Sequence, residues 1–123
     1  MPITYNIDTE AGVVFVNWHG DVSLQELERH YNKLLNDENF TNIPRAFTDL
    51  RYSKLIFTST EFWKTIDNIY RDAVEKKLLR VAILVANEEH NKYAGIWKTL
   101  MPKTVSAAIF YDPIQASAWL NGD

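Results

Sequence analysis

The chain has 123 residues and a mass of 14.3 kDa, the size of one compact domain. Hydrophobic residues make up 46% and charged residues 24%, as in ordinary globular proteins, which argues against disorder. The lack of cysteine excludes disulfides and Cys-ligated metal centres, and a net charge of −3 gives no general attraction for nucleic acid. No apolar run approaches the ~20 residues that span a bilayer. With no signal-peptide pattern at its start, the sequence predicts a cytoplasmic protein with a single domain over residues 1–123 and no nucleic-acid partner.

The first third of the chain predicts an antiparallel hairpin followed by a helix. Ile3–Asp8 and Val13–Trp18 have the composition of short strands, and a glycine-containing turn joins them. Ser23 and Glu26 have the spacing of a capping box, in which each side chain accepts a backbone amide of the other residue. Leucines then recur at helical spacing, which predicts a helix to about Asn36.

The middle of the chain predicts a strand, a loop and a second helix. Ala46–Leu50 is a strand candidate, and we interpret Arg51–Phe57 as a loop. Thr58 stands three residues before Glu61, which is the spacing of a second capping box. An apolar stripe of helical period follows and predicts a helix to about Lys77.

The last third of the chain continues the alternation of strands and helices. Arg80–Ala86 is an unbroken aliphatic run, typical of a strand that is buried on both faces of a parallel sheet. A helix through Tyr93 and Trp97 ends before a proline, a strand follows at Val105–Phe110, and Asp112–Leu120 opens with a cap and a proline. The order β-β-α-β-α-β-α-β-α predicts an α/β fold: a mixed, mostly parallel sheet with an N-terminal antiparallel hairpin and helices packed on it.

The sequence shows no catalytic motif. His19, His30 and His90 are too scattered to match a metal-ligand spacing. The few glycines form neither a nucleophile elbow nor a phosphate-binding loop. We therefore expect a non-catalytic protein without a metal or cofactor, and a small hydrolase or transferase is the least favoured alternative.

The segment Asp49–Trp63 is the most informative part of the chain. It leaves the end of a strand and enters a helix, which is where ligands collect in parallel α/β sheets. Thr58, Ser59 and Thr60 stand at the helix N-terminus, where free amides could hold a phosphate or where the hydroxyls could simply cap the helix.

Aromatic side chains accompany the same segment. Most aromatic residues of a small domain belong to its core, but those beside a loop could line an apolar pocket or lie against a membrane. The candidate ligand-binding residues are Asp49, Tyr52, Phe57, Thr58, Ser59, Phe62, Trp63 and Trp97.

Three sequence features together resemble the SpoIIAA-like family of the STAS (sulfate transporter and anti-sigma-factor antagonist) superfamily. Gly20–Ser23 leads from a hairpin into a helix, and Phe47–Leu50 is a strand that ends in Asp-Leu. Ile109–Asp112 followed by Ala116–Leu120 is similar to the family's closing strand and Ala-Trp-Leu helix. The resemblance covers nearly the whole chain.

This resemblance implies a position for a phosphorylation site. In anti-sigma-factor antagonists, an Asp-Ser-Ser-Gly tetrad follows the Asp-Leu strand, and a partner kinase phosphorylates its first serine. Counted from Asp49, the tetrad falls on Phe57, Thr58, Ser59 and Thr60, so that the hydroxyls persist while phenylalanine and threonine replace aspartate and glycine. The branch is also similar in fold to CRAL-TRIO lipid-carrying domains, which implies a lipophilic ligand or membrane association.

Two functions follow from the residues and the resemblance. The leading hypothesis is a non-catalytic binding or regulatory module that holds a small lipophilic or amphipathic ligand between residues 49–57 and the second helix, with peripheral membrane contact as a variant. The alternative is an interaction switch with a regulatory protein partner, in which Thr58 or Ser59 is the phosphoacceptor. The sequence does not indicate the oligomeric state.

Overall fold

The computed structural model describes residues 1–75 and 78–122, and it describes side chains outside residues 70–77. Within these residues, one mixed sheet organises the chain. Its strands are β1 (Ile3–Asp8), β2 (Val13–Ser23), β3 (Arg45–Ile56), β4 (Arg80–Leu84) and β5 (Ser106–Phe110). They lie side by side in the order β1-β2-β3-β4-β5; β1 and β2 are antiparallel, and each later neighbour is parallel to the one before it.

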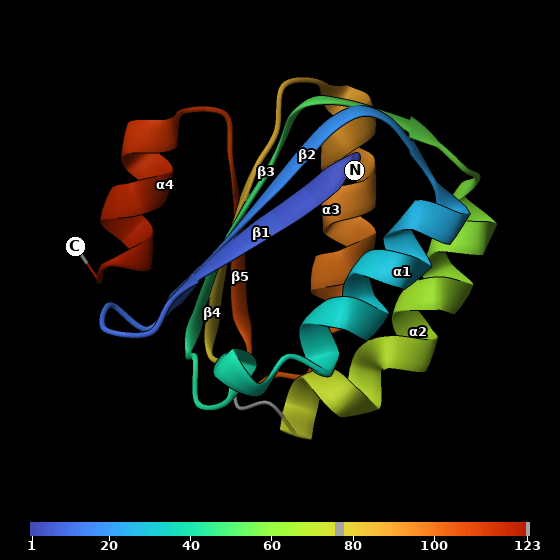
Figure 1. Cartoon of the computed structure of the whole chain (residues 1–123). Helices are drawn as coiled ribbons and strands as arrows, with labels where there is room; N and C mark the ends of the chain where they lie inside the picture. The colour runs from blue at the N-terminus through green and yellow to red at the C-terminus, as the bar shows by residue number, and fades with distance from the viewer. Residues whose placement is uncertain (76–77, 123) are drawn as a thin grey trace.

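Helices cover both faces of this sheet. They are α1 (Leu24–Leu35), α2 (Ser59–Glu75), α3 (Glu88–Leu100) and α4 (Pro113–Leu120), with a short 3-10 turn η1 (Glu38–Phe40) after α1. Figure 1 shows α1, α2 and α3 on one face and α4 on the other. The predicted α/β class, mixed sheet and element order are confirmed, while the predicted end of α2 at residues 76–77 lies outside the described residues. No helix in the described part of the chain is both long and apolar enough to cross a membrane.

Side-chain caps explain where these helices begin. The Ser23 hydroxyl accepts from the Glu26 backbone N–H at 3.2 Å. At the start of α2, the Glu61 N–H donates to Thr58 Oγ1 (3.1 Å), and the Thr58 N–H donates to the Glu61 carboxylate (2.8 Å). Asp112 accepts a first-turn amide of α4 at 3.0 Å, ahead of the proline that opens the helix. Each cap lies at the position that the sequence predicts.

The strand β3 corrects the predicted loop at Arg51–Phe57. Instead of ending at Leu50, β3 continues to Ile56, and β2 also runs past its predicted end at Trp18 to Ser23. These two strands pair along their whole length, so the segment is extended backbone in the sheet. The polar residues that indicated a loop are those of a strand with one solvent-exposed face.

A β-bulge divides β3 into two halves. Asn17 pairs with Asp49 and His19 with Tyr52, so that one residue of β2 stands opposite two residues of β3. β4 pairs with β3 only as far as Asp49. Beyond the bulge β3 therefore has one strand neighbour, β2, among the described residues, and it leads toward the N-terminus of α2 (Figure 1).

The hydrophobic core has a large part and a small part. The large part lies between the sheet and α1, α2 and α3, and the small part lies between the sheet and α4. The buried residues of the small part are Val13, Ala82, Leu84, Ala116 and Leu120.

Candidate ligand-binding cavity

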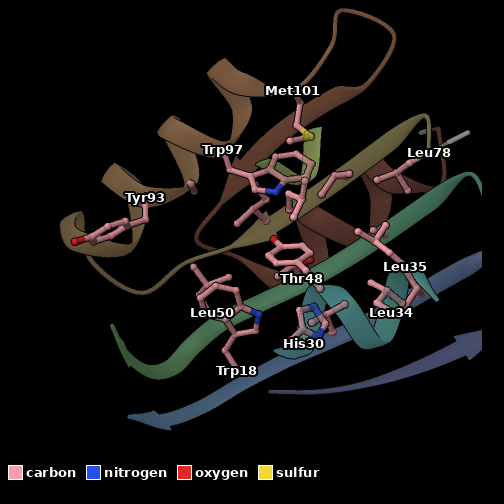
Figure 2. Close-up of a pocket in the computed structure, with 18 of the residues that line it drawn as sticks. Trp18, His30, Leu34, Leu35, Thr48, Leu50, Leu78, Tyr93, Trp97 and Met101 are labelled. Carbon is pink, nitrogen blue, oxygen red and sulfur yellow. The ribbon is translucent and has the colours of Figure 1, made fainter. Parts of the chain in front are cut away.

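An apolar cavity of about 80 Å³ lies within the large core, between the sheet and the helices α1, α2 and α3 (Figure 2). Alternate residues of β2 and β3 supply its floor, because successive side chains of a strand point to opposite faces of the sheet. Ala46 on β3 and Ala94 on α3 are small and buried, which leaves room between the sheet and this helix. Larger lining residues include Val14, Val16, Trp18, Leu34, Leu50, Phe62, Ile83 and Trp97.

A few polar groups interrupt this apolar lining. Trp18 is 4% exposed, and its indole Nε1 has no hydrogen-bond partner among the described residues. Figure 2 shows the indole nitrogens of Trp18 and Trp97 on the cavity side of their rings. His30 and Tyr31 of α1, Thr48 of β3 and Tyr93 of α3 are further lining residues with polar atoms. Such a mixture of apolar walls and a few polar atoms is typical of small-molecule sites.

Two titratable groups of this cavity, His30 and Tyr31, are uncharged at neutral pH. Burial, together with the positive charge of Lys33, lowers the pKa of His30 to about 4. Burial raises the pKa of Tyr31 to about 12, and its interaction with the Trp97 side chain offsets only part of that rise. The cavity therefore presents hydrogen-bonding groups without a full charge.

His30 also borders a second, more polar cleft of about 410 Å³ between β1 and α1. There the Tyr5 hydroxyl donates to Asp37 Oδ2 at 2.7 Å. Burial and this hydrogen bond raise the pKa of Tyr5 to about 12. The same hydrogen bond lowers the pKa of Asp37. The Lys33 ammonium lies 5.6 Å from the centre of the Tyr5 ring, and Arg29 forms an ion pair with Glu26 at 2.9 Å. The charges near His30 thus belong to the outer cleft, and His30 stands between the cleft and the cavity.

Part of the predicted site is assembled in an aromatic cluster. Phe57 and Phe62 stack at 5.6 Å between ring centres, and Tyr93 meets each of them edge-on at 5.2 Å. The Tyr93 hydroxyl donates to the Phe57 carbonyl oxygen at 2.7 Å, which ties α3 to the end of β3. Phe62 and Trp97 both line the cavity. Of the predicted residues, Phe62 and Trp97 thus border the cavity, and Phe57 packs on Phe62.

Other predicted residues lie apart from it. Asp49 is buried on the strand face opposite to Thr48 and Leu50, and it accepts two hydrogen bonds from the Arg51 guanidinium at 3.1 and 3.0 Å. This pairing raises the pKa of Arg51. Tyr52 of β3 is 69% exposed and Trp63 of α2 is 46% exposed, so these two side chains do not enclose a pocket between β3 and α2.

The predicted phosphoacceptors lie at the N-terminus of α2. Thr58 is exposed, and its hydroxyl already accepts the Glu61 amide, whereas Ser59 is half-buried as the first residue of the helix. The Glu61 carboxylate is hydrogen-bonded to the Thr58 N–H and so lies at the same helix end. The helix N-terminus is therefore capped internally.

Both ring nitrogens of His90 are engaged in hydrogen bonds to the backbone. The Ala86 N–H donates to its Nδ1 at 3.1 Å, and its Nε2 lies 2.9 Å from the Ser53 carbonyl oxygen. Because Nδ1 accepts, Nε2 carries the proton and donates to Ser53. The ring is 2% exposed and fastens α3 to the half of β3 that lies beyond the bulge.

Sequence reasoning missed most of the polar lining of the cavity, which comes from Trp18, His30, Tyr31, Thr48 and Tyr93. The sequence pattern at two of these positions could have predicted a polar group in the core. Thr48 interrupts the apolar alternation of Ala46 and Leu50, and His30 falls on the helix stripe that Leu27 and Leu34 define. A polar side chain on a core-facing stripe needs a partner, and that need can point to a site.

Comparisons with known proteins support the fold. No protein-family model and no curated protein matches the chain. Among solved structures, the chain is similar to an uncharacterised protein of the DUF3478 family with a SpoIIAA-like fold from Shewanella loihica PV-4. The TM-score is 0.63 at 16% identity, over 96% of this chain and 93% of the other. The chain has a SpoIIAA-like fold, as its sequence features predict.

Proposed function

We propose that this protein is a non-catalytic binding module that holds a small, mainly apolar ligand in the cavity beneath α1, α2 and α3. The observation that carries the proposal is an apolar cavity of about 80 Å³ whose lining includes a buried indole N–H with no partner among the described residues. Native cores leave few voids larger than a water molecule. A SpoIIAA-like fold is also suited to a regulatory or interaction module, in which ligand occupancy would alter a surface that a partner protein reads.

The size of the cavity limits the ligand. An engineered cavity of about 150 Å³ in another protein binds benzene, and one water needs roughly 10–15 Å³. The present volume is thus enough for several waters or for a small compact organic molecule, but a long lipid chain would need α1, α2 or α3 to move outward. The volume therefore favours the small lipophilic ligand of the sequence-based hypothesis over a long lipid chain.

The alternative function, a switch driven by phosphorylation of Thr58 or Ser59, has less support. A phosphate at the N-terminus of α2 would gain from the helix dipole. It would, however, displace the internal cap and bring a dianion to the Glu61 carboxylate, which already bonds the Thr58 amide. The exposed hydroxyl of Thr58 keeps this alternative testable by mass spectrometry of the purified protein.

The proposal is tested by filling the cavity. Ala46→Val adds two methyl groups to its floor, at a strand position that suits valine. Ala108→Val makes the same change on β5 and serves as the matched control, because Ala108 pairs with Ala82 and so lies on the face of the sheet that carries α4. Native mass spectrometry and organic extraction would identify a ligand that co-purifies with the unaltered protein and with Ala108→Val but not with Ala46→Val.

Xenon provides a second probe, because it enters apolar cavities without needing a hydrogen bond. We expect xenon to shift the NMR signals of cavity methyl groups, including those of Val16 and Leu50, and to lose this effect in Ala46→Val. If the unaltered protein carries no extractable ligand and xenon leaves these methyl signals unchanged, the cavity is closed to ligands and the proposal fails.

A further inference from the structure

We propose that the cavity selects uncharged molecules that carry a hydrogen-bond acceptor, such as small cyclic or short-chain ketones and aldehydes, and that Trp18 Nε1 donates to this acceptor. The inference rests on the proposed function and adds the chemical class of the ligand. It depends on three features of the cavity: an unused donor, the lack of a full charge among the described lining residues, and its volume.

The unused donor is the indole N–H of Trp18. An indole nitrogen can donate but cannot accept, so it can be satisfied only by a ligand or water atom with a lone pair. Trp18 is 4% exposed, and no described residue accepts from its Nε1. Figure 2 shows this nitrogen directed toward the space among the lining residues, where a carbonyl oxygen would lie against a mainly apolar wall.

The electrostatics of the same wall disfavour a charged ligand. His30, Tyr31, Thr48 and both indoles are neutral groups at neutral pH. The cations Arg29 and Lys33 border the outer cleft, on the far side of His30. A carboxylate in the cavity would be desolvated without an opposite charge, which is far more costly than burying a hydrogen-bonded carbonyl.

The volume sets the scale of the test ligands. At about 80 Å³ the cavity has roughly half the volume of the engineered cavity that binds benzene, so a five-membered ring with one substituent is at the upper limit of what it admits without an outward shift of the helices. Cyclopentanone and methylenecyclopentane form a matched pair of nearly equal shape, because a CH₂ group replaces the carbonyl oxygen. Cyclopentanecarboxylate supplies a charged comparison.

The experiment is a titration followed by ¹H–¹⁵N NMR of the tryptophan indole groups. Trp18→Phe identifies the Trp18 signal and removes the donor while it keeps an aromatic ring in the wall. We expect cyclopentanone to bind about fivefold more tightly than methylenecyclopentane and to move the Trp18 indole proton downfield, as a new hydrogen bond requires. In Trp18→Phe the two compounds should bind equally.

The matched control is Trp119→Phe, which alters a tryptophan that packs beside the core under α4. It should retain the fivefold preference and the shift of the Trp18 signal. If Trp18→Phe fails to fold, sequential backbone and side-chain assignment of the unaltered protein identifies the Trp18 indole signal, and its shift with cyclopentanone decides the question.

The possible failures are distinguishable. Equal binding of the ketone and the hydrocarbon with an unmoved Trp18 signal would overturn this inference and leave the proposed cavity function intact. Tighter binding of cyclopentanecarboxylate would also overturn it and would direct attention to Arg29 and Lys33. Failure of every probe to bind, together with a negative xenon test, would overturn both.

Discussion

The two faces of the sheet are covered in different ways. Under α4, the contact is built on alanines: Ala82 of β4 and Ala116 of α4 are both fully buried, and they allow the helix to approach the sheet closely. Under α1, α2 and α3, large side chains such as Trp18 and Trp97 hold the helices farther out and leave a cavity among them. The small side chains under α4 therefore let helix and sheet close together, whereas the mixture of large side chains with Ala46 and Ala94 under α1, α2 and α3 leaves a cavity.

Truncating one leucine on each face tests this contrast with the largest expected effect. Leu84→Ala in the small core and Leu50→Ala at the cavity should each lower the free energy of unfolding by about 2–5 kcal/mol. Both side chains are buried, at 0% and 4% exposure. Urea denaturation measures the losses, and added cyclopentanone should restore stability only to Leu50→Ala. If cyclopentanone instead restored the stability of Leu84→Ala, the binding site would lie on the face of the sheet that carries α4.

Acid should destabilise the cavity face through His30. The pKa of His30 is about 4 in the folded protein and ~6.5 in the unfolded chain, so between these values the unfolded chain binds the proton more readily. Stability should therefore be complete above about pH 6.5 and fall by roughly 3 kcal/mol as the pH approaches 4.

The control for this pH dependence is a histidine outside the core. His30→Leu should flatten the decrease between pH 6.5 and 4, whereas His19→Gln, at an exposed position of β2, should leave it unchanged. Denaturation at several pH values measures both. A slope that persists in His30→Leu would show that another group causes it.

Enlarging a buried alanine on each face of the sheet should destabilise the α4 face more than the cavity face. Ala82→Val overfills the contact with α4 and should cost about 1–3 kcal/mol, while Ala46→Val enters existing space and should change stability by less than about 1 kcal/mol. Thermal unfolding compares them directly. Equal losses would mean that the space beside Ala46 is already filled.

The smallest effect concerns the cap of α2, which lies outside the cavity. Thr58→Ala removes the acceptor of the Glu61 amide and should cost about 1 kcal/mol, without changing cyclopentanone affinity. Thr58→Ser keeps the hydroxyl and serves as the control. A large change in ligand affinity in Thr58→Ala would support the original placement of the site between β3 and α2.

Local signals were sufficient to predict most of the fold. The caps at Ser23, Thr58 and Asp112 act within one helical turn, so their sequence spacing predicts the helix starts. The second half of β3 was missed because its pairing with β2 is a contact between distant parts of the chain, and Arg51–Lys54 has the polar composition of a loop. The bulge opposite Trp18 depends on the same long-range pairing.

The candidate site was harder to predict for a related reason. Phe62 and Trp97 were recognised as aromatic residues on helices, and both border the cavity. A cavity, however, is the volume that remains after α1, α2 and α3 have packed on the sheet, and no single segment encodes it. By contrast, the strand alternation that turns Asp49 away from Leu50 lies within the predicted strand Ala46–Leu50 and follows from the sequence alone.

The central claim is that ligands enter the space under α1, α2 and α3. The most direct measurement is a methyl-detected NMR titration of the unaltered protein with methylenecyclopentane, a probe that needs no hydrogen bond. We predict saturable shifts at Val16, Leu50 and Ile83 around the cavity, with the methyl signals of Leu84 and Leu120 under α4 unchanged. Shifts confined to the α4 face, or no saturable shift at any methyl group, would contradict the account.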